Sequence, residues 1–299
     1  MKQRSSKMLY VGLSAVIVLA LLGLGLPAYM AWSGTRVERV PVEEDPKALG
    51  LDYEDVSFPS RGDEIILRGW YLPTSQSRRC IVIIHGVEKH RADPTIGILP
   101  LAKGLVEHGY NVLLFDLRGH GESGGNRLSM GYYERLDVLG AVDYLRSRGF
   151  QEQSIGLLGF SLGAAAAILA AAQEADIPVV ADSSFADVTE LMRRELLKHR
   201  LPGFFFYPMA FMLKLMYGID LSTIRPLDAV GHLSRPILFI HGEADSTVPP
   251  DHSQRLFQAS HNPNAQLWIV PGAEHVQAYH THPEEYVARI CAFFDQALR

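Results

Sequence analysis

One serine of this chain stands in a pattern that can turn a side-chain hydroxyl into a nucleophile. Ser161 lies between Gly159 and Gly163 in a Gly-Phe-Ser-Leu-Gly pentapeptide, after the apolar run 155–158 and before the alanine-rich run 164–172. This order predicts a strand, a sharp turn and a helix, with the glycines allowing a close backbone approach and the turn exposing the hydroxyl. We expect Ser161 to be the nucleophile. The structural alternative is a small residue at a tight turn.

A serine at its ordinary pKa is a weak nucleophile, so it needs a histidine to take its proton and a carboxylate to orient that histidine. Asp245 lies in a loop after the apolar run 237–240, and His275 lies in a Pro-Gly turn after the apolar run 267–270. Each of the three side chains therefore follows a predicted strand. The order Ser, Asp, His along the chain is the order of the α/β-hydrolase triad.

Other residues compete for two of these roles. Asp182 also follows a predicted strand, and some enzymes built on this kind of sheet have the acid one strand earlier. His280 and His282 precede the last predicted helix, where we expect surface or capping roles. For Asp245 the structural alternative is an Asx-turn or a cap in a surface loop. We retain Asp245 and His275 as the expected acid and base.

Negative charge that develops on a carbonyl oxygen requires fixed hydrogen-bond donors. The backbone N–H of Leu162 is one expected donor, because it lies at the start of a helix, where N–H groups lack intrahelical partners. The second is the N–H of Val87, in the loop after the β-branched strand predicted over 80–84. Residues 87–90 contain no further glycine, which argues against an oxyanion loop of the HGGG type.

Together these motifs resemble an α/β-hydrolase, nearest to the serine hydrolases of the Bem46-like and serine-aminopeptidase-like branch. The resemblance covers about residues 52–299 and is carried by His85-Gly86, Asp116 to Ser123, the pentapeptide around Ser161, Pro236 to Asp245 with Val248-Pro249, and Gly272 to His275. It implies an α/β fold whose mostly parallel sheet of about eight strands is flanked by helices and carries a helical lid. It also implies that Ser161, Asp245 and His275 form the triad.

Apolar periodicity predicts the elements that would position these residues. We expect an antiparallel pair of strands over 53–58 and 65–71, followed by strands that alternate with helices over 95–108, 130–148 and 284–298. Parallel strands joined by right-handed crossovers have their carboxyl ends at one edge, where ligands bind. The predicted nucleophile, acid, base and oxyanion donors all fall at that edge.

The N-terminal region carries a second strong pattern. No charge occurs between Lys7 and Arg36, and the 24 residues of 9–32 are almost wholly apolar. As a helix they would be about 36 Å long, enough to cross a hydrocarbon core of about 30 Å. We expect an uncleaved signal anchor within residues 1–35, with cleavage and secretion as the alternative. The basic residues before the segment predict a cytoplasmic N-terminus and a catalytic domain on the outer side of the cell membrane.

Beyond the anchor, we expect a polar linker over 36–50 and a single catalytic domain over 51–299. Within that domain, residues 187–226 are too many for a simple connection and predict a lid. The centre of the lid, 204–217, is strongly apolar, with Lys214 as its one charge. Three accounts compete for it: packing as ordinary core, lining of an acyl pocket, or contact with the membrane.

Composition bounds the other functions. The net charge of −5 and the isoelectric point near 6.2 give no basic footprint for nucleic acid. The twelve histidines show no metal-ligand spacing, and we expect no cofactor. We expect Cys80 and Cys291 to be separate buried thiols, with one disulfide as the alternative. The three histidines that end or follow strands beside glycines are expected to orient loops; these are His85, His120 and His241.

These features predict two-step acyl transfer. His275, oriented by Asp245, takes the proton of Ser161 as the serine attacks a carbonyl, and water then releases the acyl group. The expected substrates are carboxylic esters or thioesters, either small molecules or lipid-like acyl compounds. A serine peptidase of the aminopeptidase or oligopeptidase kind is the alternative enzyme. A non-catalytic, membrane-tethered binding module is the alternative from another class.

Overall fold

The computed structural model describes residues 10, 12–14, 21–75, 77–173 and 177–298. The chain divides into two compact units. We call them the helical unit, which comprises residues 1–36 and 189–222, and the sheet unit, which comprises residues 37–188 and 223–299. All the motifs with expected chemistry fall in the sheet unit.

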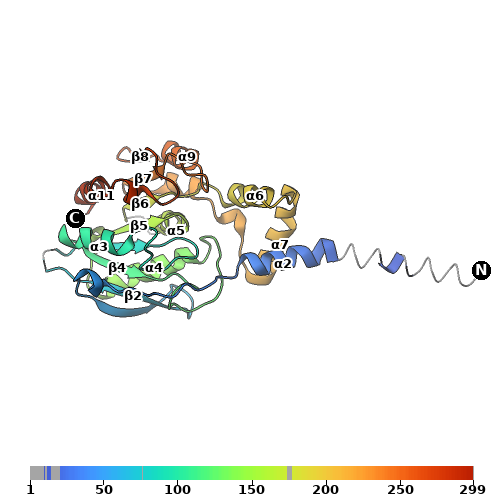
Figure 1. The fold of residues 1–299 in the computed structure, drawn as a ribbon, viewed down its shortest axis with the longest axis horizontal. Helices are drawn as coiled ribbons and strands as arrows, with labels where there is room; N and C mark the ends of the chain where they lie inside the picture. The colour runs from blue at the N-terminus through green and yellow to red at the C-terminus, as the bar shows by residue number, and fades with distance from the viewer. Residues whose placement is uncertain (1–9, 11, 15–20, 76, 174–176, 299) are drawn as a thin grey trace, which may run out of the picture. The chain divides into compact units, whose positions relative to one another are not determined.

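An eight-stranded sheet is the centre of the sheet unit (Figure 1). The strands are β1 Glu54–Pro59, β2 Ile66–Leu72, β3 Cys80–Ile84, β4 Asn111–Phe115, β5 Ile155–Phe160, β6 Val179–Asp182, β7 Ile237–Gly242 and β8 Gln266–Val270. Their order is β1-β2-β4-β3-β5-β6-β7-β8. Strand β2 is antiparallel to β1 and β4, and the other neighbours are parallel. The predicted α/β fold with about eight mostly parallel strands is confirmed.

Helices connect the parallel strands and cover the sheet. The longer helices of the sheet unit are α3 Ile98–Glu107, α4 Glu134–Ser147, α5 Leu162–Ala171, α9 Asp251–Ala259 and α11 Pro283–Ala297. Helices α3 and α11 share one cluster of buried apolar side chains with the central strands, while α4 packs against α5. Strands β3 to β7 are buried along their whole length, as expected for parallel strands covered on both faces.

Helix α3 begins later than the sequence predicts. The Asp93 carboxylate accepts hydrogen bonds from the backbone N–H groups of Thr95 and Ile96, which forms a turn instead of the first helical turn. Gly97 then adopts a left-handed conformation with φ 77°, and the α-helix starts at Ile98. The local side-chain hydrogen bonds therefore delay the helix by one turn.

Helix α4 is also shorter than predicted at its start. Met130 and Gly131 have positive φ angles of 56° and 105°, which no α-helix accommodates. The buried Glu134 carboxylate accepts the backbone N–H groups of Ser129 and Gly131 and holds this loop in place. The helix consequently begins at Glu134.

The helical unit contains a π-helical turn and several helices. They are η1 Leu21–Gly25, α2 Leu26–Gly34, most of α6 Val188–Lys198, η4 Gly203–Phe205, α7 Phe206–Tyr217 and the start of η5 Leu221–Thr223. Helix α2 packs against α7 within this unit. The predicted lid centre, 204–217, therefore forms the end of η4 and the whole of α7.

The predicted membrane-spanning segment, 9–32, lies partly outside the described residues. Among the residues that are described, no single helix has both the length and the apolar composition needed to cross a membrane. One bent pair, Gly203–Tyr217 with Leu221–His232, meets those criteria only when its two helices are counted together.

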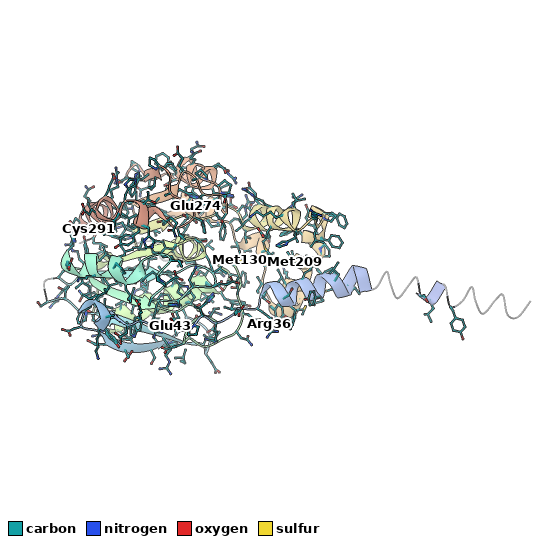
Figure 2. All side chains as sticks on the ribbon, viewed as in Figure 1. Arg36, Glu43, Met130, Met209, Glu274 and Cys291 are labelled. Atoms are coloured by element: carbon teal, nitrogen blue, oxygen red, sulfur yellow. The ribbon has the colours of Figure 1, made fainter. Side chains whose placement is uncertain are left out.

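The two cysteines are free and buried: Cys80 lies in β3, and Cys291, which is labelled in Figure 2, lies in α11. Burial raises the pKa of the Cys291 thiol to about 12 and raises that of Cys80 as well. Both thiols are therefore protonated and unreactive in the folded chain at neutral pH.

Candidate active site

Ser161 lies at a sharp turn between β5 and α5. Its backbone conformation (φ 52°, ψ −113°) is one that residues other than glycine rarely adopt. Its N–H donates to the carbonyl of Asp182 on the neighbouring strand over 2.8 Å, which holds the turn at the edge of the sheet. The flanking glycines are needed for the close approach of backbones. A Cβ on Gly163 would lie 2.3 Å from the Ile84 carbonyl, and a Cβ on Gly159 would lie 2.4 Å from the Gly163 carbonyl.

The structure brings the three predicted side chains together beyond the carboxyl ends of β5, β7 and β8. His275 Nε2 lies 2.9 Å from Ser161 Oγ, and His275 Nδ1 lies 2.7 Å from Asp245 Oδ2. Because Nδ1 faces a carboxylate, it carries the ring proton and donates it. Nε2 is then free to accept the serine proton, so this arrangement can generate a nucleophilic serine.

Asp245 is buried and surrounded by donors. Its Oδ1 accepts the backbone N–H groups of Thr247 and Val248, each over 2.9 Å, and its Oδ2 receives His275. Burial alone would raise the pKa of the Asp245 carboxyl, but hydrogen bonds from His241 and His275 hold that pKa below its ordinary value. The carboxylate is therefore ionised at neutral pH, which is the state that orients the His275 ring.

His241, at the end of β7, makes a contact that the sequence did not indicate. Its Nε2 lies 2.8 Å from the Val248 carbonyl and 3.2 Å from Asp245 Oδ2, so Nε2 must carry a proton and donate it. Its Nδ1 lies 2.6 Å from Ser253 Oγ on α9. The sequence predicted only an orienting role for this ring. The contact with Asp245 depends on how loop 243–248 folds back, which no local pattern reveals.

Asp182, the competing acid, has other partners. Its carboxylate accepts hydrogen bonds from the hydroxyl groups of Tyr286 and Ser183, both over 2.8 Å. Ser183 Oγ in turn accepts the backbone N–H of Val276, the residue after His275, over 3.1 Å. Burial raises the pKa of Asp182. This network supports the loop that carries His275. The carboxylate hydrogen-bonded to the His275 ring, however, is that of Asp245.

The two competing histidines lie elsewhere in the sheet unit. His280 is part of the short helix α10 Ala278–Thr281, with Nε2 3.2 Å from the Pro94 carbonyl. His282 immediately precedes α11. In the described part of the chain, the ring that contacts the Ser161 hydroxyl is that of His275.

Both predicted oxyanion donors belong to backbone segments beside Ser161. Leu162 is the first residue of α5, so its N–H has no acceptor within the helix. Gly86 lies against the serine, since a Cβ added to it would be 3.4 Å from the Ser161 Cβ. Val87 follows directly, and Glu88 after it has a positive φ of 55°, which turns the loop away from the strand.

Two buried histidines hold this loop. His85 Nδ1 donates to the Gly86 carbonyl over 2.7 Å, and its Nε2 accepts the Leu117 N–H over 3.0 Å. His120 Nε2 accepts the Glu88 N–H over 3.2 Å. Burial lowers the pKa of both rings, so both are neutral at pH 7 and keep one acceptor nitrogen. Their predicted role as loop-orienting residues is consistent with these hydrogen bonds.

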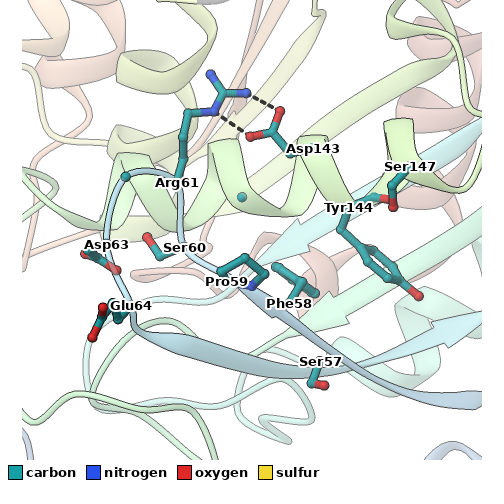
Figure 3. Close-up of a pocket in the computed structure, with 12 residues that line it drawn as sticks. Ser57, Phe58, Pro59, Ser60, Arg61, Asp63, Glu64, Asp143, Tyr144 and Ser147 are labelled. Carbon is teal, nitrogen blue, oxygen red and sulfur yellow. Dashed lines mark hydrogen bonds and ion pairs between the residues drawn. The ribbon is translucent and has the colours of Figure 1, made fainter.

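A separate cavity of about 730 Å³ lies between the β1–β2 turn and α4. Figure 3 shows the ion pair of Arg61 and Asp143 at this cavity, with oxygen–nitrogen distances of 2.6 and 2.5 Å. Its walls include Phe58 and Tyr144, whose rings stack. The residues that line it do not include the serine, aspartate and histidine described above, so we assign it no part in their chemistry.

Comparison with known families gives one match that covers most of the sheet unit. A model described as the prolyl oligopeptidase family matches residues 101–299, a span that includes Ser161, Asp245 and His275. The uncharacterized protein YqkD of Bacillus subtilis is 32% identical over 238 residues, which cover 77% of this chain and 75% of YqkD.

Two solved structures with related sequences have the same fold. The esterase Pf2001 of Pyrococcus furiosus superposes with a TM-score of 0.75 at 28% identity, covering 89% of this chain and 98% of the esterase. Est1E of Butyrivibrio proteoclasticus, solved with ferulic acid bound, superposes with a TM-score of 0.64 at 25% identity, covering 81% of this chain and 98% of Est1E.

Proposed function

The chain belongs to the prolyl oligopeptidase family and is a serine hydrolase of the α/β-hydrolase superfamily, and from this premise we propose that it cleaves carboxylic esters or thioesters through an acyl-enzyme on Ser161. One observation carries the proposal: His275 lies between the Ser161 hydroxyl and the buried Asp245 carboxylate, 2.9 Å from the first and 2.7 Å from the second. A histidine held in this way can remove the proton of an attacking serine.

The reaction proceeds in two steps. His275 Nε2 accepts the Ser161 proton as Oγ attacks the carbonyl carbon, and the resulting imidazolium then protonates the leaving group. The acyl group is left as an ester of Ser161. Water, deprotonated by the same nitrogen, attacks that ester and releases the acid. Asp245 keeps the ring in the required tautomer throughout.

The negative charge of each tetrahedral intermediate falls on the former carbonyl oxygen. In the proposed mechanism the backbone N–H groups of Leu162 and Val87 donate to it, supported by the positive end of the α5 dipole. The hydrogen bonds of His85 and His120 to the residues on either side of Val87 support this role, because they would hold the Val87 N–H before charge develops. Fixed donors of this kind typically contribute about 10²–10³ each to the rate.

Esters are favoured over peptides by the structural neighbours. The neighbour with the higher TM-score of the two is an esterase, and the other was solved with an aromatic acid bound. The alternative, a serine peptidase, is supported by the family description. Both substrate classes use the same triad and oxyanion donors, so the leaving group must be identified by experiment.

A substrate panel tests the proposal. The full chain would be assayed on p-nitrophenyl esters of increasing acyl length and on aminoacyl and peptidyl p-nitroanilides, beside Ser161→Ala and the surface control Ser147→Ala. We expect ester hydrolysis that Ser161→Ala lowers at least about 10³-fold and Ser147→Ala leaves unchanged. Faster cleavage of anilides would make the chain a peptidase. Equal rates for wild type and Ser161→Ala would reject the mechanism.

The proposal includes a location. Residues 9–32 would anchor the chain in the cell membrane with a short cytoplasmic N-terminus and the sheet unit on the outer side, joined through the polar segment 36–50. The support is the uncharged segment between Lys7 and Arg36. Mass measurement of the chain purified from membranes distinguishes this anchor from a signal peptide that is cleaved before secretion. An N-terminus beyond residue 32 would contradict anchoring.

A further inference from the structure

The two units carry net charges of opposite sign. The helical unit contains nine lysines and arginines against three aspartates and glutamates, a net charge of +6; without Lys2, Arg4 and Lys7, which the proposed topology puts on the cytoplasmic side, its net charge is +3. The sheet unit contains nineteen against thirty, a net charge of −11. Folding does not require such a separation, whereas an anionic partner for the helical unit would explain it.

Helix α7 has large apolar side chains on two opposite sides. The buried side consists of Phe206, Met212, Leu213 and Met209, the last of which is labelled in Figure 2. Four large side chains, one from η4 and three from α7, recur every three or four residues and are 61–68% exposed. We call these four residues, Phe204, Tyr207, Phe211 and Leu215, the α7 face. This spacing puts them on one side of a helix. A contiguous apolar surface of this kind marks an interaction site.

Basic side chains accompany the α7 face within the helical unit. The Arg193 guanidinium lies 5.9 Å from the ring centre of Tyr207. Helix α6 and the turn after it also carry the exposed residues Arg194, Leu197, Lys198 and Arg200. Cations beside exposed aromatic and aliphatic side chains are typical of segments that lie in the interface of an anionic membrane.

Helix α2 connects this surface to the apolar N-terminal segment. It packs against α7, and it forms the last part of the uncharged stretch between Lys7 and Arg36. At its end the Arg36 guanidinium lies 4.8 Å from the ring centre of Trp32, which is 39% exposed, and Tyr29 is exposed one turn earlier. Trp, Tyr and Arg are the residues that anchor helices at the headgroup level.

We propose that the α7 face is a membrane-binding surface that inserts among the headgroups of a bilayer containing anionic lipids, with the basic side chains of α6 contacting those headgroups. The inference uses the proposed membrane location, because α2 places the α7 face in the same compact unit as the N-terminal segment. It does not use the proposed hydrolysis. A second copy of the chain and an acyl substrate are the other occupants that the test must distinguish.

Site-specific fluorescence tests the surface directly. Because Cys80 and Cys291 are buried, Phe211→Cys would take an NBD label selectively, and Ser147→Cys on α4 is the matched control in the sheet unit. The full chain would be reconstituted with phosphatidylcholine vesicles with or without phosphatidylglycerol, and with nitroxide-labelled lipid. We expect the label at 211 to shift to shorter wavelength and to be quenched by the nitroxide, most strongly with phosphatidylglycerol. The label at 147 should show neither effect.

Three outcomes would overturn the proposal. Emission and quenching at 211 that match those at 147 would show that the surface does not meet lipid. A blue shift that grows with protein concentration and is insensitive to nitroxide would identify a second copy as the occupant. The third outcome is that the α7 face binds acyl chains of the substrate, and the double variant Phe211→Ser with Leu215→Ser tests it. This outcome would be shown if the double variant had a higher KM for long-chain esters but not for short ones in the absence of vesicles, and if nitroxide failed to quench the label at 211.

Discussion

At the scale of residues, the chemistry of the site depends on where two histidine protons lie. His275 Nδ1 and His241 Nε2 both donate to Asp245 Oδ2, while two backbone N–H groups donate to its other oxygen. The carboxylate is therefore fixed in position and in charge. That leaves His275 Nε2 as the free acceptor opposite Ser161 Oγ.

Asp245→Asn tests this proton arrangement. The amide NH₂ of asparagine can donate a hydrogen bond to His275 Nδ1. The proton of the neutral ring would then lie on Nε2, which faces the serine and could no longer accept its proton. We expect kcat to fall by about 10⁴-fold while the variant stays folded at the assay temperature. Asp182→Asn is the control, because that carboxylate does not contact the ring. If the two variants lost activity equally, the assignment of Asp245 as the acid would be wrong.

His241 is a positioning residue for the same carboxylate, and pH profiles distinguish this role from a purely structural one. His241→Leu removes a donor to Asp245, so the pKa of that carboxyl should rise. We expect kcat to fall about tenfold while KM stays constant, and activity to be lost in acid at a higher pH than in wild type, because a carboxylate with one donor fewer attracts a proton on the His275 ring more strongly. His241→Gln, which restores an N–H donor, should move the pH profile back toward that of wild type. If the pH profile of His241→Leu did not differ from that of wild type, the role of His241 would be limited to packing.

The depressed pKa of Asp245 also predicts how stability depends on pH. The pKa of the Asp245 carboxyl is lower in the folded chain than its unfolded value of about 3.9. The carboxylate therefore stabilises the folded chain at any pH above about 3.9, and this contribution is lost as the pH falls through the folded-state pKa. The free energy of unfolding of wild type should therefore exceed that of Asp245→Asn at neutral pH, and the difference should shrink below about pH 4. Chemical denaturation across this range measures it. A difference that is constant with pH would contradict the linkage.

The three side chains of the candidate triad were predictable from the sequence, but the contacts that hold the loop of His275 were not. Ser161, Asp245 and His275 each follow an apolar strand, so a local pattern indicated them. The support of the His275 loop comes from Ser183 and Val276, which both have positive φ and meet only in the folded chain. Backbone conformations of this kind carry no recognisable signal in residues other than glycine or asparagine.

At the scale of elements, the site requires α5 to lie very close to β3. Gly163 allows this, because a Cβ there would lie 2.3 Å from the Ile84 carbonyl and 2.5 Å from that of His85. The elements themselves were predictable wherever apolar periodicity was long, as in the central strands and in α11. Helix starts were less predictable. At α3 and α4, carboxylates of Asp93 and Glu134 bind loop N–H groups and replace the first helical turn.

Gly163→Ala tests this close approach. The added methyl group must push α5 away from β3, so we expect a loss of about 1–3 kcal/mol of stability and a displaced serine with reduced kcat. Gly231→Ala is the matched control, since a Cβ at that position makes only ordinary contacts, the nearest at 3.5 Å. Equal melting temperatures for the two variants would show that β3 and α5 are less tightly packed than described.

At the scale of the whole molecule, reactive chemistry belongs to the acidic sheet unit, while apolar and basic side chains concentrate in the helical unit. The sequence predicted an apolar segment over 204–217 but left its environment open among core, pocket and membrane. The structure shows why a single answer was not available: α7 has buried apolar residues on one side and exposed ones on the other.

The buried cysteines report on the integrity of the sheet unit. Cys80 lies in the interior strand β3, and its thiol should react with a disulfide reagent only when the unit unfolds. We expect no modification of the native full chain over hours and complete modification in denaturant, with the transition coinciding with loss of secondary structure. Rapid modification under native conditions would indicate local opening of the central sheet.

The most direct test of the central claim is labelling of the full-length chain in detergent with a fluorophosphonate probe, comparing wild type with Ser161→Ala and His275→Ala. The account predicts stoichiometric labelling of wild type at Ser161 and loss of labelling in both variants, because the probe reacts only with an activated serine. A folded wild type that does not react, or a Ser161→Ala variant that reacts as well as wild type, would contradict it.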